Sequence, residues 1–315
     1  MPAVPAVPAP MSPADPAVPS PPPADAQQER QPLPDARFAV PGAALLILAA
    51  LLLGFAANLT VVSHLQHARA QQTGFAELRE QLALGTAPVG QTDYRGHPLD
   101  PGAPVALLRI PALDLREVVF EGTTPGVLTA GPGHRRDTVL PGQAGTSVLM
   151  GRQWAYGGPF RELHTLAVGD TVEITTGQGE HVYRVTGLRY PGDEVPAPAG
   201  EGEGRLTLIT ATGGPYTPSD ALRVDAELTT GVQPAPARIF PVGSLGPGEE
   251  TLEGDSRVWI QVLLWSQGLL LAALAVTWAY RNWGRAQAWI VGVPLLGGLS
   301  VGLSGALTML LPNLL

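Results

Sequence analysis

The sequence predicts a membrane-anchored all-β protein, in which one domain of seven or eight short strands is combined with three transmembrane helices. Between residues 103 and 230, short runs rich in β-branched residues are separated by glycine and proline turn signals, which is typical of an all-β domain. Outside this range, three long runs are almost free of charge and are long enough to span a bilayer, which takes roughly 20 residues. The chain of 315 residues is therefore expected to hold one compact domain with appendages.

Composition excludes several classes of function. The 19 basic residues are all arginine, 27 acidic residues outnumber them, and no basic cluster is present, which argues against nucleic-acid binding. The chain has no cysteine, which excludes disulfides, thiolate metal sites and cysteine catalysis. His64 and His67 lie three residues apart, but two histidines without a third ligand favour surface positions over a metal site. We expect neither a metal nor a cofactor.

The first two segments are interpreted as a tail and a membrane anchor. Residues 1–37 repeat Pro-Ala-Val-Pro units and hold too few apolar side chains to offset the entropy of ordering, which predicts a disordered tail; a proline-rich ligand is the alternative. Residues 38–63 carry no charge and predict the first transmembrane helix. Small residues at Ala68-Arg69-Ala70 leave a cleaved signal peptide as the alternative, but the apolar run exceeds the roughly 7–15 residues of a signal sequence.

Residues 64–102 are expected to form a helical stalk followed by a loop. Helical composition continues to Leu84, and charged residues within this stretch, such as Glu77, indicate a solvated surface. The helix is expected to end before Gly85, because glycine is the usual residue just beyond a helix C-terminus. A loop rich in proline and glycine then leads into the β domain.

The β domain is predicted over residues 103–230. Thr176-Gly177-Gln178-Gly179 resembles a hairpin turn between two alternating strands. The expected strand segments are Val105–Ile110, Glu117–Phe120, Gly126–Leu128, Ser147–Met150, Val168–Thr175, His181–Leu188, Leu206–Thr210 and Leu222–Leu228.

The last part of the chain is predicted to return to the membrane. Residues 231–257 form an acidic, proline-containing linker, and residues 258–280 and 288–312 form the second and third spans. The connection at 281–287 carries two arginines, whereas acidic residues precede the second span. By the positive-inside rule, this connection and the tail are cytoplasmic and the β domain is extracytoplasmic.

The third span contains two glycines, Gly298 and Gly302, at the spacing that permits close helix packing. A partner transmembrane helix and an intramolecular contact are both consistent with this pattern. From these features, the expected partners are the membrane and a helix of another membrane protein.

One stretch, from Gly131 to Phe160, carries a family resemblance. It contains Gly131-Pro132-Gly133-His134, Thr138-Val139-Leu140-Pro141-Gly142 and Tyr156-Gly157-Gly158-Pro159-Phe160, and Leu206–Ala211 follows about fifty residues later. This pattern resembles the sortases, membrane-anchored cysteine transpeptidases of Gram-positive cell surfaces, and most closely the housekeeping-type actinobacterial group. The resemblance implies a closed β-barrel, and closure also removes exposed sheet edges.

The same resemblance implies that the catalytic positions are replaced. Arg152 stands where the family has its histidine, Ala211 where it has its cysteine, and Arg223 matches the family's arginine. Ala211 offers no attacking atom, and an arginine stays protonated, so Arg152 cannot serve as a general acid or base. The neighbouring Thr210 and Thr212 point to the opposite face of the strand from position 211 and lack a base. The sequence therefore predicts a pseudo-sortase.

The resemblance adds a peptide or surface protein to the expected partners and leaves three functional hypotheses. Arg152 and Arg223 together would make a cationic groove that binds an extended peptide with a carboxylate, unless Arg152 points into solvent. An assembly scaffold that pairs through its spans is the second hypothesis. The third is an active, cysteine-independent transpeptidase that attaches surface proteins to the cell wall.

Overall fold

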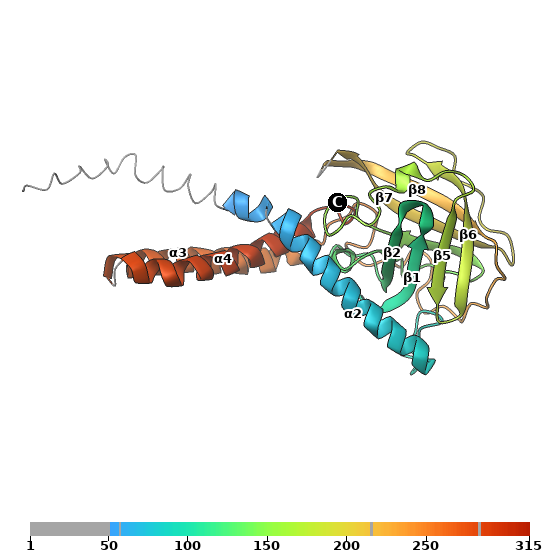
Figure 1. Ribbon diagram of the computed structural model, residues 1–315, viewed down its shortest axis with the longest axis horizontal. Coiled ribbons are helices and arrows are strands. Elements are labelled where there is room, and N and C mark those ends of the chain that lie inside the picture. The colour runs from blue at the N-terminus through green and yellow to red at the C-terminus, as the bar shows by residue number, and fades with distance from the viewer. Residues whose placement is uncertain (1–50, 57, 215–216, 283–284) are drawn as a thin grey trace, which may run out of the picture. The chain divides into compact units, whose positions relative to one another are not determined.

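The structure is a computed structural model that describes residues 51–56, 58–214, 217–282 and 285–315. The predicted tail and most of the first predicted span lie outside these residues. In the described part of the chain, a β-barrel is preceded by one long helix, α2 (Ser63–Leu84), and followed by two, α3 (Trp259–Asn282) and α4 (Arg285–Leu310) (Figure 1).

The described strands form a closed barrel of eight, in the order β1-β2-β3-β4-β7-β8-β6-β5. The pairs β2–β3 and β4–β7 are parallel and the remaining pairs are antiparallel. The predicted closed barrel of seven or eight strands is confirmed. The strands are β1 (Pro104–Ile110), β2 (Leu115–Glu121), β3 (Gly133–His134), β4 (Gly145–Met150), β5 (Thr171–Thr176), β6 (Gly179–Arg189), β7 (Gly204–Gly214) and β8 (Thr217–Leu228).

Two details differ from the predicted strands. The predicted strand at Gly126–Leu128 is wrong, because Val127–Thr129 forms a short 3-10 helix, η3. The main-chain nitrogen of Leu128 donates to the carbonyl of Thr124 at 3.0 Å, so this backbone closes a local turn instead of joining the sheet. Strand β3 was not predicted, because two residues are too short to show the alternation that identifies a strand.

Helix α2 packs on the barrel, so the prediction of a solvated stalk is wrong for one of its faces. Leu78 is buried against Val118 and Phe120 of β2. The side chain of Gln71 donates to the Val118 carbonyl at 3.1 Å and accepts from the Val118 nitrogen at 2.6 Å. Figure 1 shows the helix beside β1 and β2. As predicted, the helix ends before Gly85, which takes the left-handed conformation.

His67 is not the surface residue that the sequence predicted. Its side chain is buried between α2 and the barrel, where Nε2 lies 3.0 Å from a carboxylate oxygen of Glu117 on β2. His64, three residues earlier, is exposed. The two side chains therefore point in different directions along the helix, and nothing brings them together as ligands.

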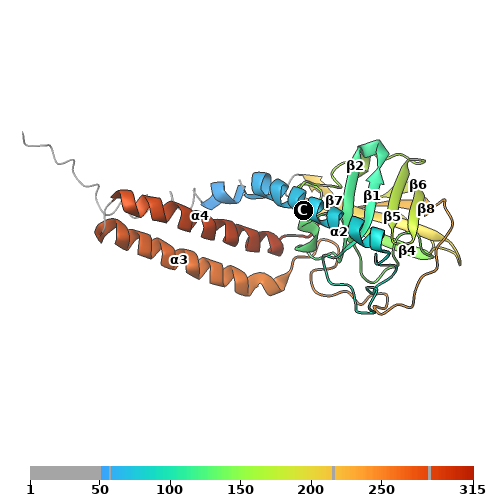
Figure 2. The same ribbon diagram turned by 60° about the horizontal axis from the view of Figure 1, so that its bottom comes forward.

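Two helices of the described chain, α3 and α4, are long and apolar enough to cross a membrane. They lie side by side (Figure 2). Gly302 of α4 faces the Trp265 ring of α3, and an added Cβ would come within 2.8 Å of that ring. This glycine therefore serves an intramolecular contact, whereas the position of Gly298 has no atom of the described chain within 4 Å. Three spans were predicted; the first falls mostly outside the described residues and stays a prediction.

Candidate functional site

The positions that the resemblance assigns to catalysis lie at the ends of β4 and β7. These two strands pair in parallel, with Met150 opposite Ile209. The Gly151 nitrogen donates to the Ile209 carbonyl at 3.0 Å, and Thr210 Oγ1 donates to the Gly151 carbonyl at 2.9 Å. The pairing places Arg152 and Ala211 on adjacent segments, one residue beyond these contacts. We call this part of the barrel the Ala211 end.

Ala211 lies in an apolar environment. Its side chain is buried in a cluster with residues of β4, β7 and β8 and with Leu314 from beyond α4. Thr210 is turned to the Gly151 carbonyl, as the alternation along a strand predicts. The cluster consists of Leu128, Val148, Met150, Ile209, Ala211, Ala221 and Leu314.

Arg152 does not point into solvent; its side chain is fully buried. Nη2 donates to the Pro125 carbonyl at 2.9 Å, Nη1 donates to the main-chain oxygen of Leu315 at 3.4 Å, and the guanidinium stacks over the Tyr156 ring at 5.0 Å. No carboxylate of an Asp or Glu in the described residues pairs with it. Burial lowers the pKa of Arg152 to about 10, so the group stays protonated near neutral pH and cannot act as a base.

Arg223 lies in a different environment. It is half-buried on β8, opposite Ile209 of β7. It lines a pocket of about 410 Å³, which we call the Arg223 pocket and whose lining includes neither Arg152 nor Ala211. Val148 and Ile209 belong both to this pocket and to the apolar cluster at Ala211, so the two regions adjoin. The structure thus places the two arginines in neighbouring but separate surroundings.

The Arg223 pocket contains two further arginines that are already neutralised. Arg189 makes two hydrogen bonds to Asp225, and this contact raises the pKa of Arg189. Arg135 likewise binds Asp137 through two hydrogen bonds, of 2.8 and 3.1 Å. The side chain of Arg223 makes no hydrogen bond or ion pair with another described residue, although Asp193 also lines the pocket. The cationic character of this pocket is therefore local to Arg223.

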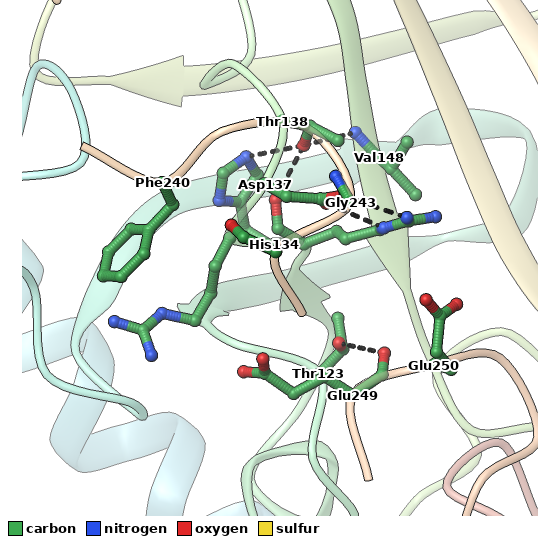
Figure 3. Close-up of polar contacts among 12 residues, drawn as sticks. Thr123, His134, Asp137, Thr138, Val148, Phe240, Gly243, Glu249 and Glu250 are labelled. Carbon is green, nitrogen blue, oxygen red and sulfur yellow. Dashed lines mark hydrogen bonds and ion pairs between the residues drawn. The ribbon is translucent and has the colours of Figure 1, made fainter. Parts of the chain in front are cut away.

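A buried network supports the loop between β3 and β4, and Figure 3 shows part of it, with the His134 ring beside the Thr138 hydroxyl. His134 contacts a carboxylate oxygen of Glu121 through Nδ1 at 2.8 Å and the Val139 carbonyl through Nε2 at 2.9 Å. Both partners accept hydrogen bonds, so only the doubly protonated ring satisfies them. Burial by itself would lower the pKa of His134, but the Glu121 carboxylate, the Val139 carbonyl and Asp137 together outweigh it and the net direction is upward. This geometry gives His134 a structural role.

The acidic linker is attached to the same loop. In Figure 3 the Gly243 nitrogen donates to Asp137 at 2.9 Å, and Thr123 Oγ1 donates to the Glu249 carbonyl at 2.7 Å. Arg136 also stacks over the Phe240 ring at 4.4 Å. These contacts hold the linker against the barrel between Phe240 and Glu249.

The remaining histidines add no catalytic group at the Ala211 end. His164 and His97 are exposed, whereas His181 is buried and contacts Thr176 Oγ1 at 3.0 Å. Burial lowers the pKa of His181. Within the described part of the chain, no group of three His, Cys, Asp or Glu side chains is placed to hold a metal ion.

Sequence analysis missed the residues that follow α4. It assigned everything up to 312 to the third span and gave no role to the last three residues, but α4 ends at Leu310 and Leu314 reaches the Ala211 cluster. Pro312 is the residue from which the end of α4 could have been predicted, because a proline disfavours helical conformation in the residue before it. The contacts beyond Pro312 have no signal in the local sequence.

Residues 108–229, which reach from β1 to β8, match the family model of the sortase domain. The barrel is therefore similar to the sortase domain, and the protein is sortase-like. Among curated proteins, sortase SrtE1 of Streptomyces coelicolor is 32% identical over 163 residues, which are 46% of this chain and 44% of that protein. The chain thus matches less than half the length of this relative.

Solved structures of sortases are also similar. They include the sortase D5 transpeptidase of Clostridium perfringens (23% identity, TM-score 0.43, 51% of this chain and 99% of that chain) and sortase E1 of Streptomyces coelicolor with a tripeptide in the active site (23%, 0.36, 42% and 91%). Sortase E of Streptomyces avermitilis is 31% identical, with a TM-score of 0.36 over 42% of this chain and 91% of that chain. The assignment of the domain rests on the sequence matches, because these TM-scores are below 0.5.

Proposed function

We propose that the protein is a catalytically inactive, sortase-like membrane protein of the cell envelope that binds a peptide or protein partner through the barrel. The observation that carries this proposal is the Ala211 end. There, an alanine in an apolar cluster occupies the position of the nucleophile, and a buried arginine bound to main-chain oxygens occupies the position of the acid. Acyl transfer needs an attacking atom and a group that exchanges protons near neutral pH, and neither residue provides one.

The alternative is an active, cysteine-independent transpeptidase. It would need a hydroxyl with a base within hydrogen-bond reach. The hydroxyl of the preceding residue, Thr210, is turned away from position 211 and donates to the Gly151 carbonyl. The geometry therefore favours binding over catalysis.

The Arg223 pocket is the proposed contact for a ligand. An extended peptide with an acidic side chain or a free carboxylate would find one arginine there without a carboxylate partner, beside the apolar side chains of Val148 and Ile209. Because Asp137, Asp193 and Asp225 offset the other charges nearby, selectivity would come from a charge-assisted hydrogen bond to Arg223, not from a strong field.

Location in the membrane is part of the same proposal. We place α3 and α4 in the bilayer as a hairpin, the barrel outside the cell, and the 281–287 connection in the cytoplasm. An assembly scaffold remains the second candidate, supported by the open surface of α4 at Gly298.

The orientation can be tested by labelling. Because the chain has no cysteine, a single cysteine introduced at exposed Ser219 should react with an impermeant maleimide on intact cells. Labelling only after lysis would contradict the orientation.

Peptide binding can be tested with the full chain in detergent. Fluorescently labelled acidic and neutral peptides of equal length are titrated, and we expect the acidic one to bind more tightly. Arg223→Gln should weaken its binding by about 10- to 100-fold, since a hydrogen bond to a charged group contributes about 1.5–3 kcal/mol. Arg184→Gln, at an exposed position on β6, is the matched control and should have no effect. Equal affinity for both peptides would contradict the proposal and favour the scaffold.

Activity is tested on the same preparation. Neither the wild type nor Ala211→Cys should cleave or transfer a sorting-motif peptide. The added thiol would lie beside Arg152, which supplies neither a base nor a proton donor. Turnover by the wild type well above the buffer rate would contradict the inactive assignment.

A further inference from the structure

The residues after α4 lie against the sortase domain. Leu311–Leu315, which we call the tail segment, starts where α4 ends, and Asn313, Leu314 and Leu315 are all buried. The Gln153 nitrogen donates to the Leu314 carbonyl at 2.9 Å, and the Ala155 nitrogen lies 3.4 Å from the Leu315 oxygen. The tail segment is thus hydrogen-bonded to the loop that follows β4 and carries Arg152.

The side chain of Leu314 fills the space beside Ala211. It is completely buried and belongs to the same apolar cluster as Ala211 of β7 and Ala221 of β8. Alanines face each other at this point of the β7–β8 pair, so the sheet leaves room for one larger side chain from outside the barrel. The tail segment supplies that side chain.

The next residue meets the other replaced position. The main-chain oxygen of Leu315 accepts a hydrogen bond from Arg152 Nη1. The other hydrogen bond of this guanidinium goes from Nη2 to the Pro125 carbonyl. Removing the tail segment would leave a buried cation with one fewer acceptor, which is costly in an apolar environment. Two consecutive residues therefore cover the positions of both the nucleophile and the acid.

Asn313 holds the tail segment in place through hydrogen bonds of its side-chain amide. Its Nδ2 donates to the Thr123 carbonyl at 2.9 Å and to the Glu250 carbonyl at 2.8 Å, and its Oδ1 accepts from the Leu252 nitrogen at 3.0 Å. Figure 3 shows Thr123 and Glu250 together, on the loop after β2 and on the linker. One buried amide thus joins the barrel, the linker and the end of α4.

We propose that the Ala211 end is a self-occupied peptide site, with the tail segment as its resident ligand. This inference rests on the proposed function, because it concerns the same domain as a binding module, and it names what that end of the site accepts. The accepted ligand is an extended segment with a leucine-sized side chain beside Ala211 and a main-chain oxygen at Arg152. A segment of another protein with this chemistry binds there only when the tail segment leaves, and leaving also detaches the end of α4.

Thiol reactivity tests the proposal in the full chain, which has no cysteine of its own. A single cysteine is introduced by Ala211→Cys, and the reaction of this introduced thiol with a soluble maleimide is timed in detergent. The reaction should be slow, and adding Leu314→Asp should accelerate it. We expect an acceleration of about 10- to 100-fold, the equilibrium shift that corresponds to the loss of one buried leucine side chain. Asn313→Ala, a milder change, should accelerate it less.

Matched controls separate release of the tail segment from unfolding. Val242→Asp, at a residue that is 75% exposed on the linker, should leave the reaction of the introduced thiol slow. Circular dichroism of each variant should show a folded barrel. Equal rates with and without Leu314→Asp, whether both fast or both slow, would overturn the proposal, because the tail segment would then not be what covers position 211.

A second measurement tests whether the vacated site takes a peptide. A synthetic peptide Leu-Pro-Asn-Leu-Leu should slow the reaction of the introduced thiol in the variant that also carries Leu314→Asp, and a peptide with aspartate in place of its fourth residue should not. No protection by either peptide would overturn the assignment of a peptide site. Neither readout involves Arg223 or an acidic ligand, so failure of the Arg223 pocket to bind acidic peptides leaves this inference standing, and the reverse also holds.

Discussion

Arg152 and Arg223 belong to the same domain and lie in opposite physical situations. Arg152 is fully buried, stacks on Tyr156 and is held by main-chain oxygens that include one from the tail segment. Arg223 is half-buried at the edge of an open pocket and has no carboxylate partner among the described residues. The comparison shows that the environment of one residue type depends on which parts of the chain pack on it; we call the surroundings of Arg152 the closed end and those of Arg223 the open end.

The closed end is expected to be the more sensitive to substitution. Leu314→Ala should lower the free energy of unfolding by about 2–5 kcal/mol, the usual cost of truncating a fully buried leucine. Val195→Ala, at a 74% exposed position of the Arg223 pocket, is the control and should change it by less than about 0.5 kcal/mol. Denaturant unfolding in detergent measures both. Similar small effects would mean that the tail segment is only loosely held.

The free energy of unfolding should depend on pH through His134, which holds the loop between β3 and β4 beside the Arg223 pocket. Its pKa in the folded protein is raised above the unfolded value of 6.5, so its contribution to stability is complete below pH 6.5 and is lost as the pH rises through the folded-state pKa. His134→Gln should therefore destabilise the protein more at pH 6 than at pH 9, by up to about 1.5–3 kcal/mol. Thermal unfolding at both pH values measures the difference, and exposed His164→Gln is the control. A pH-independent effect would refute the charged state inferred for His134.

The attachment of α4 can be weakened without touching the site. An added Cβ at Gly254 would lie within 2.3 Å of the Leu310 carbonyl oxygen, so Gly254→Ala forces the linker and the end of α4 apart. We expect a loss of about 1–3 kcal/mol, typical of overpacking, and a faster reaction of the introduced thiol in the Ala211→Cys background. Gly231→Ala, in the same linker with no described atom within 4 Å, should change neither quantity. If stability falls while the thiol reacts at an unchanged rate, the contact between the linker and α4 does not control release of the tail segment.

The smallest expected effect is the salt dependence of acidic-peptide binding at the Arg223 pocket. Only the long-range charge attraction of this contact responds to salt, whereas its hydrogen bond does not; for an exposed pair that attraction contributes no more than about 1 kcal/mol and is screened over roughly 8 Å at physiological ionic strength. Affinity should therefore fall by less than about fivefold when the salt concentration is raised, whereas thiol protection by the tail segment should stay constant. A steep salt dependence would indicate a more cationic ligand site than the pocket provides.

Much of the fold was predictable because it depends on local patterns in the sequence. Alternating residues and turn signals identified every described strand except the two-residue β3, and the uncharged runs identified α3 and α4. Gly85 marked the end of α2. The absence of cysteine and the identity of Ala211 also follow from the sequence alone. Each of these features depends on residues close together in the chain or on composition.

The environment of each site residue was decided only by the tertiary structure. Arg152 and Leu315 are 163 positions apart, too far for a local pattern to relate them, and their contact turns a residue that could have faced solvent into a buried one. His67 became a buried partner of Glu117 for the same reason, since helical composition does not say which face of a helix meets a barrel. Burial and pairing of charges depend on which distant segments pack together, so they emerge only when the chain is folded.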